Sequence, residues 1–448
     1  MGNLFGTDGI RGTANAKLTP ELALRMGRIA ASLLGRESKE KRPFFLLGRD
    51  TRLSGSMLEG ALAAGITSTG TDVHLLGIVS TPAVAFLTRR LGARGGVMIS
   101  ASHNLMADNG IKFFGSEGYK LSDALEAEAE ALYIKDEDEI PRPQGAAVGR
   151  VVGAARSVRQ YRSFLRERAP VLQGIKVVLD CANGSLYRLA PALYRELGAV
   201  IVALGVSPDG TNINVNCGST SVGRLQQAVT QHGADVGLAF DGDGDRLIAV
   251  DEQGAIVDGD AIMAVCATYL KEKNMLSGNT LVATVMSNGG LDLLAGEQGF
   301  RVLRTSVGDR FVLEEMQKGG YDLGGEQSGH IIFSRHLPTG DGLLTSLQLL
   351  GIMVEKGQPL SRLASIMRCL PQLLVNCRVK EMQEWEKNER IAQSIAQAKE
   401  RLGTGRVLVR ASGTEPLIRI MLEGDNNSLL QEISRELAAV VTEELGHA

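Results

Sequence analysis

Three acidic residues alternate with glycines in the segment DGDGDR, Asp241–Arg246, directly after an apolar run. The glycines allow a tight turn that presents the three carboxylates on one side. Such clustered anions repel one another unless a cation neutralises them, and an all-oxygen ligand set suits magnesium, manganese or calcium. The segment therefore predicts a catalytic metal site formed by Asp241, Asp243 and Asp245.

Two other interpretations of this segment are an EF-hand calcium loop and an ordinary acidic surface turn. The acidic spacing, continued to Glu252, matches the calcium loop, but Arg246 stands where that loop needs glycine for its sharp turn. The flanking residues GADVGLAF and RLIAVDEQG also look like strands, whereas an EF-hand has helices there. We therefore favour the catalytic metal site over both alternatives.

A second polar loop, ISASHNLMADNGIK at Ile99–Lys112, follows a predicted strand and exposes Ser102 beside His103 and Asn104. A serine next to a histidine is common in polar loops and does not by itself indicate function. No GxSxG elbow surrounds Ser102, which argues against an α/β-hydrolase nucleophile. Because a separate oxygen-ligand metal loop exists, Ser102 becomes a candidate for carrying a phosphoryl group, with Ser100 as the nearby competitor.

A third loop, GGEQSGH at Gly324–His330, lies between two strand-like segments. Glu326 and Ser328 would exchange hydrogen bonds with hydroxyl groups, and His330 would bind or move protons. A plain β-turn with incidental polar residues would also explain the segment.

The segment RASGTEP, Arg410–Pro416, also lies between two predicted strands, and its central turn offers backbone N–H groups and hydroxyls that suit a phosphate. A plain hairpin would explain the glycine and the proline but not the nearby arginines. The residues expected to bind phosphate here are Arg410, Ser412, Gly413, Thr414 and Arg419.

Other glycine-rich loops carry Arg11, Arg49 and Arg52, and the loop TSVGDR carries Asp309 and Arg310. The arginines suit oxyanions, although a surface salt bridge is the simpler explanation for each of them. No GxGxxG fingerprint follows a strand and no GxxxxGK[ST] segment occurs, so dinucleotide and P-loop nucleotide binding lose their main support.

The chain has 448 residues, which predicts two to four domains, and its 44% hydrophobic and 22% charged residues are typical of a folded soluble protein. A formal net charge of -3 provides no basic field for nucleic acid or an anionic membrane. Five cysteines without a CxxC pair indicate a reducing compartment. Without a signal peptide or a membrane-spanning apolar stretch, we expect a cytoplasmic protein.

The elements that must position these loops alternate between strands and helices over most of the chain. This alternation predicts mainly parallel or mixed sheets covered by helices. The pattern restarts after a polar stretch at 134–149 and again near residue 280, and after Pro371 it changes to that of a small α+β domain. The main predicted strands are 44–47, 72–76, 96–100, 176–180, 200–204, 236–240, 280–285 and 301–304.

With these loops in this order, the chain resembles the α-D-phosphohexomutases essentially end to end, from FGTDGIRG to RASGTEP. The resemblance implies an α/β protein of four domains around a central cleft: three related α/β domains with mixed sheets and a C-terminal α+β domain. The implied domains are 1–149 with the phosphoserine loop, 150–255 with the metal loop, 256–370 with the sugar-binding loop, and 371–448 with the phosphate-binding loop.

By position, the resemblance implies that Ser102 is a phosphoserine whose phosphate completes the shell of one Mg2+ held by the three aspartates. Lys112 and His330 match positions that the family associates with proton transfer. The implied substrate-binding residues are Arg11, Arg246, Asp309, Arg310, Glu326, Ser328, Arg410, Ser412, Gly413, Thr414 and Arg419.

The implied reaction interconverts glucosamine 6-phosphate and glucosamine 1-phosphate, which supplies UDP-N-acetylglucosamine synthesis. Glucosamine 1,6-bisphosphate is the implied intermediate, and this compound or glucose 1,6-bisphosphate is the implied activator. The choice of glucosamine depends on Gln327 and Ala411, which resemble that branch of the family. Two alternatives stay open: a mutase of glucose or mannose phosphates, and a non-catalytic sugar-phosphate sensor. A homodimer is a further open expectation.

The chain departs from the family pattern at two places. Leu105 stands where proline is usual, and Ser221 and Val222 stand where His-Pro is common. Neither departure removes a proposed ligand.

Overall fold

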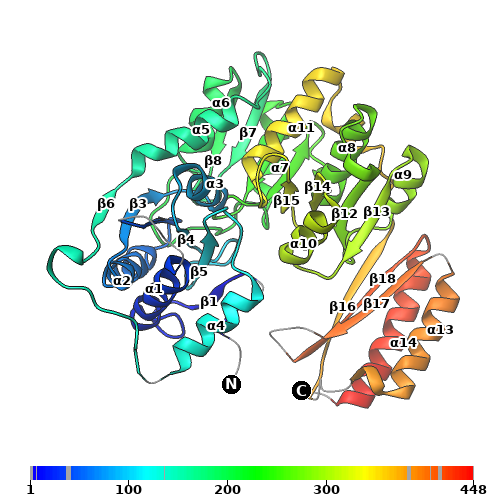
Figure 1. Ribbon diagram of the computed structural model, residues 1–448. Coiled ribbons are helices and arrows are strands. Elements are labelled where there is room, and N and C mark those ends of the chain that lie inside the picture. The colour runs from blue at the N-terminus through cyan, green and yellow to red at the C-terminus, as the bar shows by residue number, and fades with distance from the viewer. Residues whose placement is uncertain are drawn as a thin grey trace. The chain divides into compact units, whose positions relative to one another are not determined.

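The computed structural model of the protein describes residues 4–6, 8–36, 42–135, 137–380, 385–403, 405–411 and 416–446. The chain divides into two compact units (Figure 1). The larger unit comprises Met1–Met286 and Gln298–Ile366, and the smaller unit comprises Ser287–Glu297 and Met367–Ala448. None of the helices in the described part of the chain has the length and apolar character that a membrane span requires.

The first sheet of the larger unit has six strands in the order β1-β5-β4-β2-β3-β6. β2 pairs in parallel with β3 and β4, whereas β5 runs antiparallel to β1 and β4, so the sheet is mixed. The strands are β1 (Ile10–Thr13), β2 (Phe44–Arg49), β3 (Asp72–Ile78), β4 (Gly95–Ile99), β5 (Asp108–Gly115) and β6 (Val151–Gly153).

Helices α1 and α2 pack against each other beside this sheet (Figure 1). Their backbones approach so closely that a Cβ atom at Gly65 would lie 2.1 Å from the Leu24 carbonyl oxygen, so glycine is required there. α1 begins where Thr19 accepts a hydrogen bond from the Leu22 amide and Pro20 occupies the first turn. The helices of this region are α1 (Pro20–Gly35), α2 (Gly55–Thr67), α3 (Thr81–Leu91) and α4 (Asp123–Ile134).

The second sheet has five strands in the order β11-β10-β9-β7-β8. β7 pairs in parallel with β8 and β9, and the antiparallel pair β9 and β10 is joined by the acidic loop 241–246. The strands are β7 (Lys176–Asp180), β8 (Val200–Leu204), β9 (Val236–Phe240), β10 (Leu247–Asp251) and β11 (Ile256–Val257), and the helices are α5 (Val158–Arg166), α6 (Leu189–Glu196) and α7 (Gly223–His232).

The third sheet has four strands in the order β13-β12-β14-β15, and the antiparallel pair β14 and β15 carries the loop 326–330. The strands are β12 (Thr280–Thr284), β13 (Arg301–Thr305), β14 (Leu323–Gly325) and β15 (Ile331–Phe333). The helices are α8 (Gly259–Glu272), α10 (Asp309–Gly319), α11 (Gly342–Lys356) and α12 (Leu360–Ala364).

The smaller unit is an antiparallel sheet in the order β16-β18-β17 with two long helices that share an apolar core with it. The segment 287–297 belongs to this unit because the Gly289 amide donates at 3.0 Å to both carboxylate oxygens of the buried Glu423. The elements are α9 (Gly290–Gln298), β16 (Gln372–Arg378), α13 (Glu389–Leu402), β17 (Arg406–Ala411), β18 (Leu417–Glu423) and α14 (Asn427–Leu445). Short 3-10 helices of the chain are Gly145–Ala147, Ala155–Ser157, Ser277–Asn279 and Trp385–Lys387.

Three mixed sheets with helices, followed by an α+β unit, confirm the predicted fold class. Strands, and not helices, flank the acidic loop, which rules out an EF-hand. Five site residues lie in regular structure where loops were expected. Asp309 and Arg310 begin α10, and Arg410 is in β17. Arg11 and Lys112 are in the neighbouring strands β1 and β5. The reason is the ladder between these strands, in which Arg11 stands opposite Gly110.

Candidate active site

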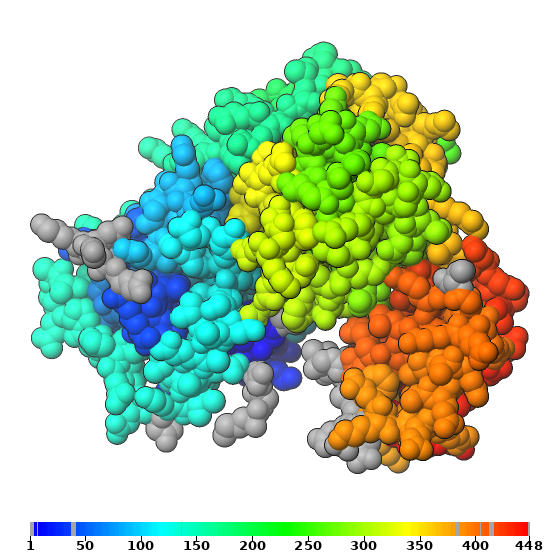
Figure 2. All heavy atoms as spheres, turned by 45° about the vertical axis from the view of Figure 1, so that its right-hand side comes forward, coloured from blue at the N-terminus to red at the C-terminus, as the bar shows by residue number. Residues whose placement is uncertain are grey.

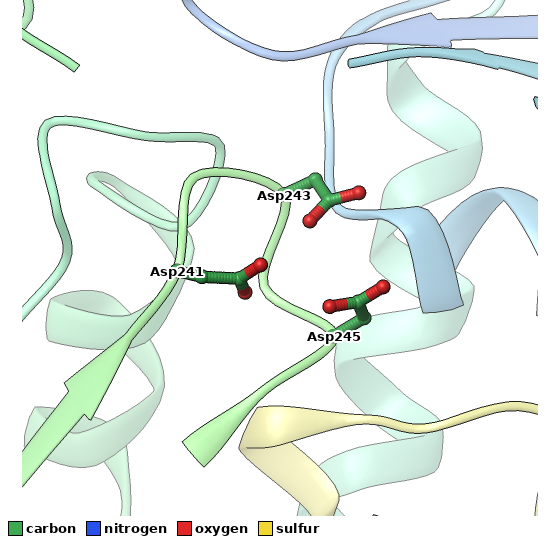
Figure 3. A group of neighbouring side chains, drawn as sticks. All are labelled: Asp241, Asp243 and Asp245. Carbon is green, nitrogen blue, oxygen red and sulfur yellow. The ribbon is translucent and has the colours of Figure 1, made fainter. Parts of the chain in front are cut away.

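Asp241, Asp243 and Asp245 form a buried acidic cluster at the turn between β9 and β10. One ligand atom from each lies within 4.8 Å of the others, and Figure 3 shows the three side chains pointing into one space. The alternating glycines allow this arrangement: Gly244 has a φ of 74°, and a Cβ atom at Gly242 would lie 2.6 Å from the Ser102 carbonyl oxygen.

The acidic cluster fits a divalent cation. Asp243 Oδ1 and Asp245 Oδ1 are buried, and neither has a hydrogen-bond partner among the described residues. Burial, together with the charges of Asp245 and Asp243, holds the pKa of Asp241 well above its ordinary value. Since buried unpaired carboxylate oxygens are unfavourable, an oxygen-seeking cation would supply the interaction that these atoms lack.

Ser102 lies directly against this cluster although it is more than a hundred residues away in sequence. Its Oγ donates to Asp241 Oδ2 at 2.5 Å and lies 3.3 Å from His103 Nδ1, and the residue is only 1% exposed. Ser102 has a φ of 52°, a left-handed conformation that is uncommon for a serine. The structure thus brings together the two loops that the sequence singled out separately.

Lys112 extends from β5 into the same cluster. Its Nζ lies 2.9 Å from Asp243 Oδ2, 3.3 Å from Asp245 Oδ2 and 3.0 Å from Asp8 Oδ2. Burial lowers the pKa of Lys112, but the charges of Asp243, Asp8 and Asp245 outweigh this effect and hold the pKa well above its ordinary value. The ammonium group therefore neutralises part of the acidic charge beside Ser102.

His330 is buried on the other side of Asp245. Its Nδ1 lies 3.6 Å from Asp245 Oδ2 and its Nε2 lies 3.5 Å from Asp309 Oδ2, while the Gly340 amide donates to Nε2 at 3.1 Å. Burial lowers the pKa of His330, and Asp245 and Asp309 raise it to a net value above the ordinary one. The ring thus connects the metal loop to the first turn of α10.

Asp8 and Lys120 belong to this site, although sequence reasoning did not assign them a role. The Asp8 carboxylate pairs with Arg11, Lys112 and Lys120, and Lys120 Nζ also donates to Asp309 Oδ2 at 2.5 Å. Burial raises the pKa of Asp8, but its three cationic neighbours lower it well below the ordinary value. Asp8 stands within FGTDGIRG and could have been noticed there, whereas no motif marks Lys120.

Two further arginines that the sequence singled out, Arg246 and Arg310, differ in their surroundings. Arg246 Nε is buried without a hydrogen-bond partner in the described structure, 4.0 Å from Asp245 Oδ1. Arg310 instead pairs with Asp123 and lies 3.4 Å from Glu126 and 3.1 Å from Glu314. Arg246 therefore has an unused donor at the metal loop, and Arg11 Nε is likewise buried without a hydrogen-bond partner among the described residues.

The β14–β15 turn presents the residues expected to contact hydroxyl groups. Glu326 Oε1 accepts from the Gly308 amide at 3.1 Å, and Ser328 Oγ is buried without a hydrogen-bond partner in the described structure. The Leu247 amide donates to the Gly329 carbonyl at 3.0 Å, so this turn is anchored to the start of β10. A Cβ atom at Gly329 would lie 2.0 Å from the Leu247 carbonyl oxygen, which explains the glycine.

A cavity of about 460 Å3 opens beside these residues in the larger unit, with Lys120, Asp309, Arg310 and His330 among its lining. Residues near 123 (cyan) and near 310 (yellow-green) meet at the surface there, as Figure 2 shows and the Arg310–Glu126 pair requires. The cavity gives polar side chains of the site access to solvent.

The smaller unit carries the two arginines of the predicted phosphate-binding loop. Arg410 of β17 stands directly opposite Arg419 of β18. Burial and the charge of Arg419 lower the pKa of Arg410. Ser412, Gly413 and Thr414 lie outside the described residues.

Family models match four segments of the chain: the phosphoglucomutase/phosphomannomutase α/β/α domains I, II and III at residues 2–139, 159–254 and 258–369, and the C-terminal domain at 374–440. A phosphoglucosamine mutase of Symbiobacterium thermophilum is 54% identical over 99% of this chain and 100% of that protein. One of Brevibacillus brevis is 52% identical over the same shares.

Solved structures share the fold. A phosphoglucomutase/phosphomannomutase family protein of Burkholderia thailandensis superposes with a TM-score of 0.82 at 24% identity and covers 98% of this chain and 97% of its own. An N-acetylphosphoglucosamine mutase of Aspergillus fumigatus, solved with GlcNAc-6P and magnesium, gives a TM-score of 0.68 at 18% identity, with 98% and 96% covered. The four matched domains and the full-length relatives show that the chain belongs to the phosphoglucomutase/phosphomannomutase family.

Proposed function

We propose that this chain catalyses the interconversion of glucosamine 6-phosphate and glucosamine 1-phosphate with Ser102 as the phosphorylated residue. The observation that carries the proposal is the 2.5 Å hydrogen bond from Ser102 Oγ to Asp241 within a buried three-aspartate cluster. The choice of glucosamine is supported by relatives that are 51–54% identical along the whole chain and are named phosphoglucosamine mutase.

In the proposed reaction, a hydroxyl oxygen of the sugar phosphate forms a bond to phosphorus while the bond between phosphorus and Ser102 Oγ breaks. The product is glucosamine 1,6-bisphosphate, which turns around and returns its other phosphoryl group to Ser102. Lys112, which its raised pKa keeps protonated, is assigned to donate the proton that the released Ser102 hydroxyl regains, and His330 is assigned to accept the proton that leaves the attacking hydroxyl. Since phosphoryl transfer needs little covalent chemistry from the protein, positioning and charge neutralisation should dominate.

One Mg2+ is the proposed metal, held by Asp241, Asp243 and Asp245 together with the phosphate on Ser102. A bound divalent cation neutralises charge on a transferring phosphoryl group. The buried, unpartnered oxygens of Asp243 and Asp245 support this assignment.

Sugar and phosphate contacts are assigned by the same reasoning. Glu326 and the unpartnered hydroxyl of Ser328 are proposed to form hydrogen bonds with sugar hydroxyls. The other proposed substrate contacts are Arg11, Arg246, Asp309, Arg310, Arg410, Ser412, Gly413, Thr414 and Arg419. A bisphosphate activator, a homodimer, a cytoplasmic location and the domain limits 1–149, 150–255, 256–370 and 371–448 stay predictions.

A coupled assay with glucosamine, glucose and mannose phosphates, each with saturating bisphosphate activator, tests the proposal. The expected result is the highest kcat/KM for glucosamine phosphate, one phosphate mapped to Ser102 by mass spectrometry, and turnover lowered by orders of magnitude in Ser102→Ala. A clear preference for mannose or glucose phosphate would change the substrate and keep the mechanism. Full activity in Ser102→Ala, or phosphate mapped to Ser100, would reject the assignment of Ser102.

A further inference from the structure

Arg52 lies beneath the Ser102 loop, and its guanidinium group has all five N–H donors placed on acceptors. Nε donates to Asp50 Oδ2 at 2.8 Å, and both side chains are 0% exposed. Nη1 and Nη2 donate at 2.6–3.1 Å to four backbone carbonyls, those of Ser102, Asn104, Leu105 and Asp108. Arg52 has no donor left for an oxyanion, and its ion pair with Asp50 is buried, whereas the simpler explanation from the sequence was a salt bridge at the surface.

A second chain of hydrogen bonds connects Arg52 to the amide of Ser102. Asp50 Oδ2 accepts from Ser100 Oγ at 2.6 Å, and Ser100 Oγ accepts from the Ser102 amide at 2.9 Å. Asp50 Oδ1 also accepts from the Arg52 amide at 2.9 Å. The buried Arg52–Asp50 ion pair thus binds the Ser102 carbonyl directly and the Ser102 amide through Ser100. The hydroxyl of Ser102 donates to Asp241.

The Ser102 loop needs such support. Ser102 has a φ of 52°, which a serine adopts only where its surroundings impose it. Asn214 donates at 2.9 Å to the carbonyls of Ser102 and Asn104 as well, but the carbonyls of Leu105 and Asp108 receive hydrogen bonds from Arg52 and not from Asn214. The Leu105 carbonyl also accepts from the Asp108 amide at 3.2 Å. Removing the guanidinium group would therefore take the Arg52 donor from the Asp108 carbonyl and leave the other three carbonyls with one hydrogen bond each, so the loop would be held less firmly.

We propose that Arg52, held by Asp50 and linked to the serine amide through Ser100, is a positioning residue that fixes Ser102 for phosphoryl transfer. The inference rests on the proposed function, in which Ser102 carries the phosphoryl group. Lysine cannot replace Arg52, because an ammonium group presents its donors from a single point and cannot span carbonyls arranged around a planar fork. Because Arg52 lies under the loop and all of its N–H donors are used, it has none left for the substrate. Its loss should therefore slow phosphoryl transfer and leave substrate binding nearly unchanged.

The test compares Arg52→Lys with Arg28→Lys. Arg28 is a matched control, because it is also buried and donates to Asp138 at 2.6 Å, Ser68 at 2.5 Å and the Ile140 carbonyl at 2.7 Å, away from the Ser102 loop. We expect Arg52→Lys to lower kcat about 100-fold with KM changed less than about threefold. Hydrogen exchange should accelerate at the amides of 102–108 in this variant and not in the control.

Equal kcat in the two arginine variants, or unchanged exchange at 102–108, would overturn the inference. If Arg52→Lys does not fold, Ser100→Ala decides, since it breaks the link between Asp50 and the Ser102 amide in a smaller step. We expect that variant to lower kcat about tenfold while phosphate still maps to Ser102, and undiminished kcat would count against the inference. Ser102→Ala in the same assay separates the proposed function from the positioning role of Arg52. If Ser102→Ala stays active, the proposed function fails. If it is inactive while Arg52→Lys and Ser100→Ala match the control, only the positioning role fails.

Discussion

Thr81, the first residue of α3, makes two hydrogen bonds to Asp243 in the metal loop. Its amide donates to the Asp243 carbonyl at 2.9 Å, and its Oγ1 donates to Asp243 Oδ2 at 2.6 Å. Because Lys112 also donates to Oδ2, this oxygen is fully occupied and Oδ1 is the one without a hydrogen-bond partner. Thr81 therefore sets which carboxylate oxygen is available to a cation.

The first prediction concerns Thr81→Val, which keeps the side-chain shape and removes the hydroxyl. A hydrogen bond to a charged group contributes about 1.5–3 kcal/mol. We therefore expect this variant to bind Mg2+ and Mn2+ roughly tenfold more weakly. Isothermal titration of the purified enzyme with each metal measures the binding without turnover. Thr88→Val is the control on the same helix, since the Thr88 hydroxyl donates to the Val84 carbonyl. Equal metal affinity in the two variants would contradict the role of Thr81.

The second prediction concerns the metal ligands themselves. Asp243→Asn keeps the size of the side chain but removes one negative charge from the buried cluster, so metal affinity and phosphoryl transfer should both fall by more than about tenfold. Glu297→Gln makes the same chemical change at an exposed position and should leave both unchanged. Both variants are then assayed after thorough chelation. If Asp243→Asn is as active as Glu297→Gln, Asp243 does not hold a catalytic metal.

Sequence reasoning identified the residues of the site whose chemistry is evident from local spacing. DGDGDR and SASHN each follow a strand, and this placement is what the structure shows. The contact between Asp241 and Ser102 could be expected only from the family resemblance, because it joins two different sheets.

Residues defined by their distant partners could not be found in this way. Lys120 lacks a motif, and its partner Asp309 is 189 residues away along the chain. The role of Arg52 was out of reach for a related reason: an arginine in a glycine-rich loop suits an oxyanion or a surface salt bridge, and only the fold shows that backbone carbonyls occupy its donors.

The third prediction concerns the pH dependence of stability. Buried Asp341 accepts from the Leu344 amide at 3.0 Å and from Tyr161 Oη at 2.7 Å, yet burial raises its pKa to about 6. An unfolded aspartate has a pKa of about 3.9, so the folded state binds the proton more tightly. Ionisation of this group therefore lowers stability as pH rises from about 4 to about 6, by roughly 3 kcal/mol in total.

Asp341→Asn keeps the helix cap and cannot ionise. The free energy of unfolding of this variant, minus that of the unmodified protein, should therefore increase as pH rises from 4.5 to 7.5. Thermal unfolding followed by circular dichroism measures this difference. Tyr161→Phe removes a hydrogen bond that lowers the pKa of Asp341, so it should extend the loss of stability to higher pH. A stability difference between Asp341→Asn and the unmodified protein that does not depend on pH would contradict the assignment.

The last prediction concerns Arg410, which stands opposite Arg419 in the sheet of the smaller unit. Like charges on directly opposed residues destabilise a sheet, by up to about 1 kcal/mol, unless an anion binds between them. Arg410→Gln should therefore stabilise the smaller unit slightly, while KM for the sugar phosphate rises at least tenfold through loss of a charge-assisted hydrogen bond. Trp385 is the only tryptophan of the chain and packs against the core of this unit, so its fluorescence during urea unfolding reports the stability directly. Arg378→Gln removes an exposed positive charge from the same sheet and should change neither quantity. A loss of stability together with an unchanged KM in Arg410→Gln would show that Arg410 supports the fold and does not bind phosphate.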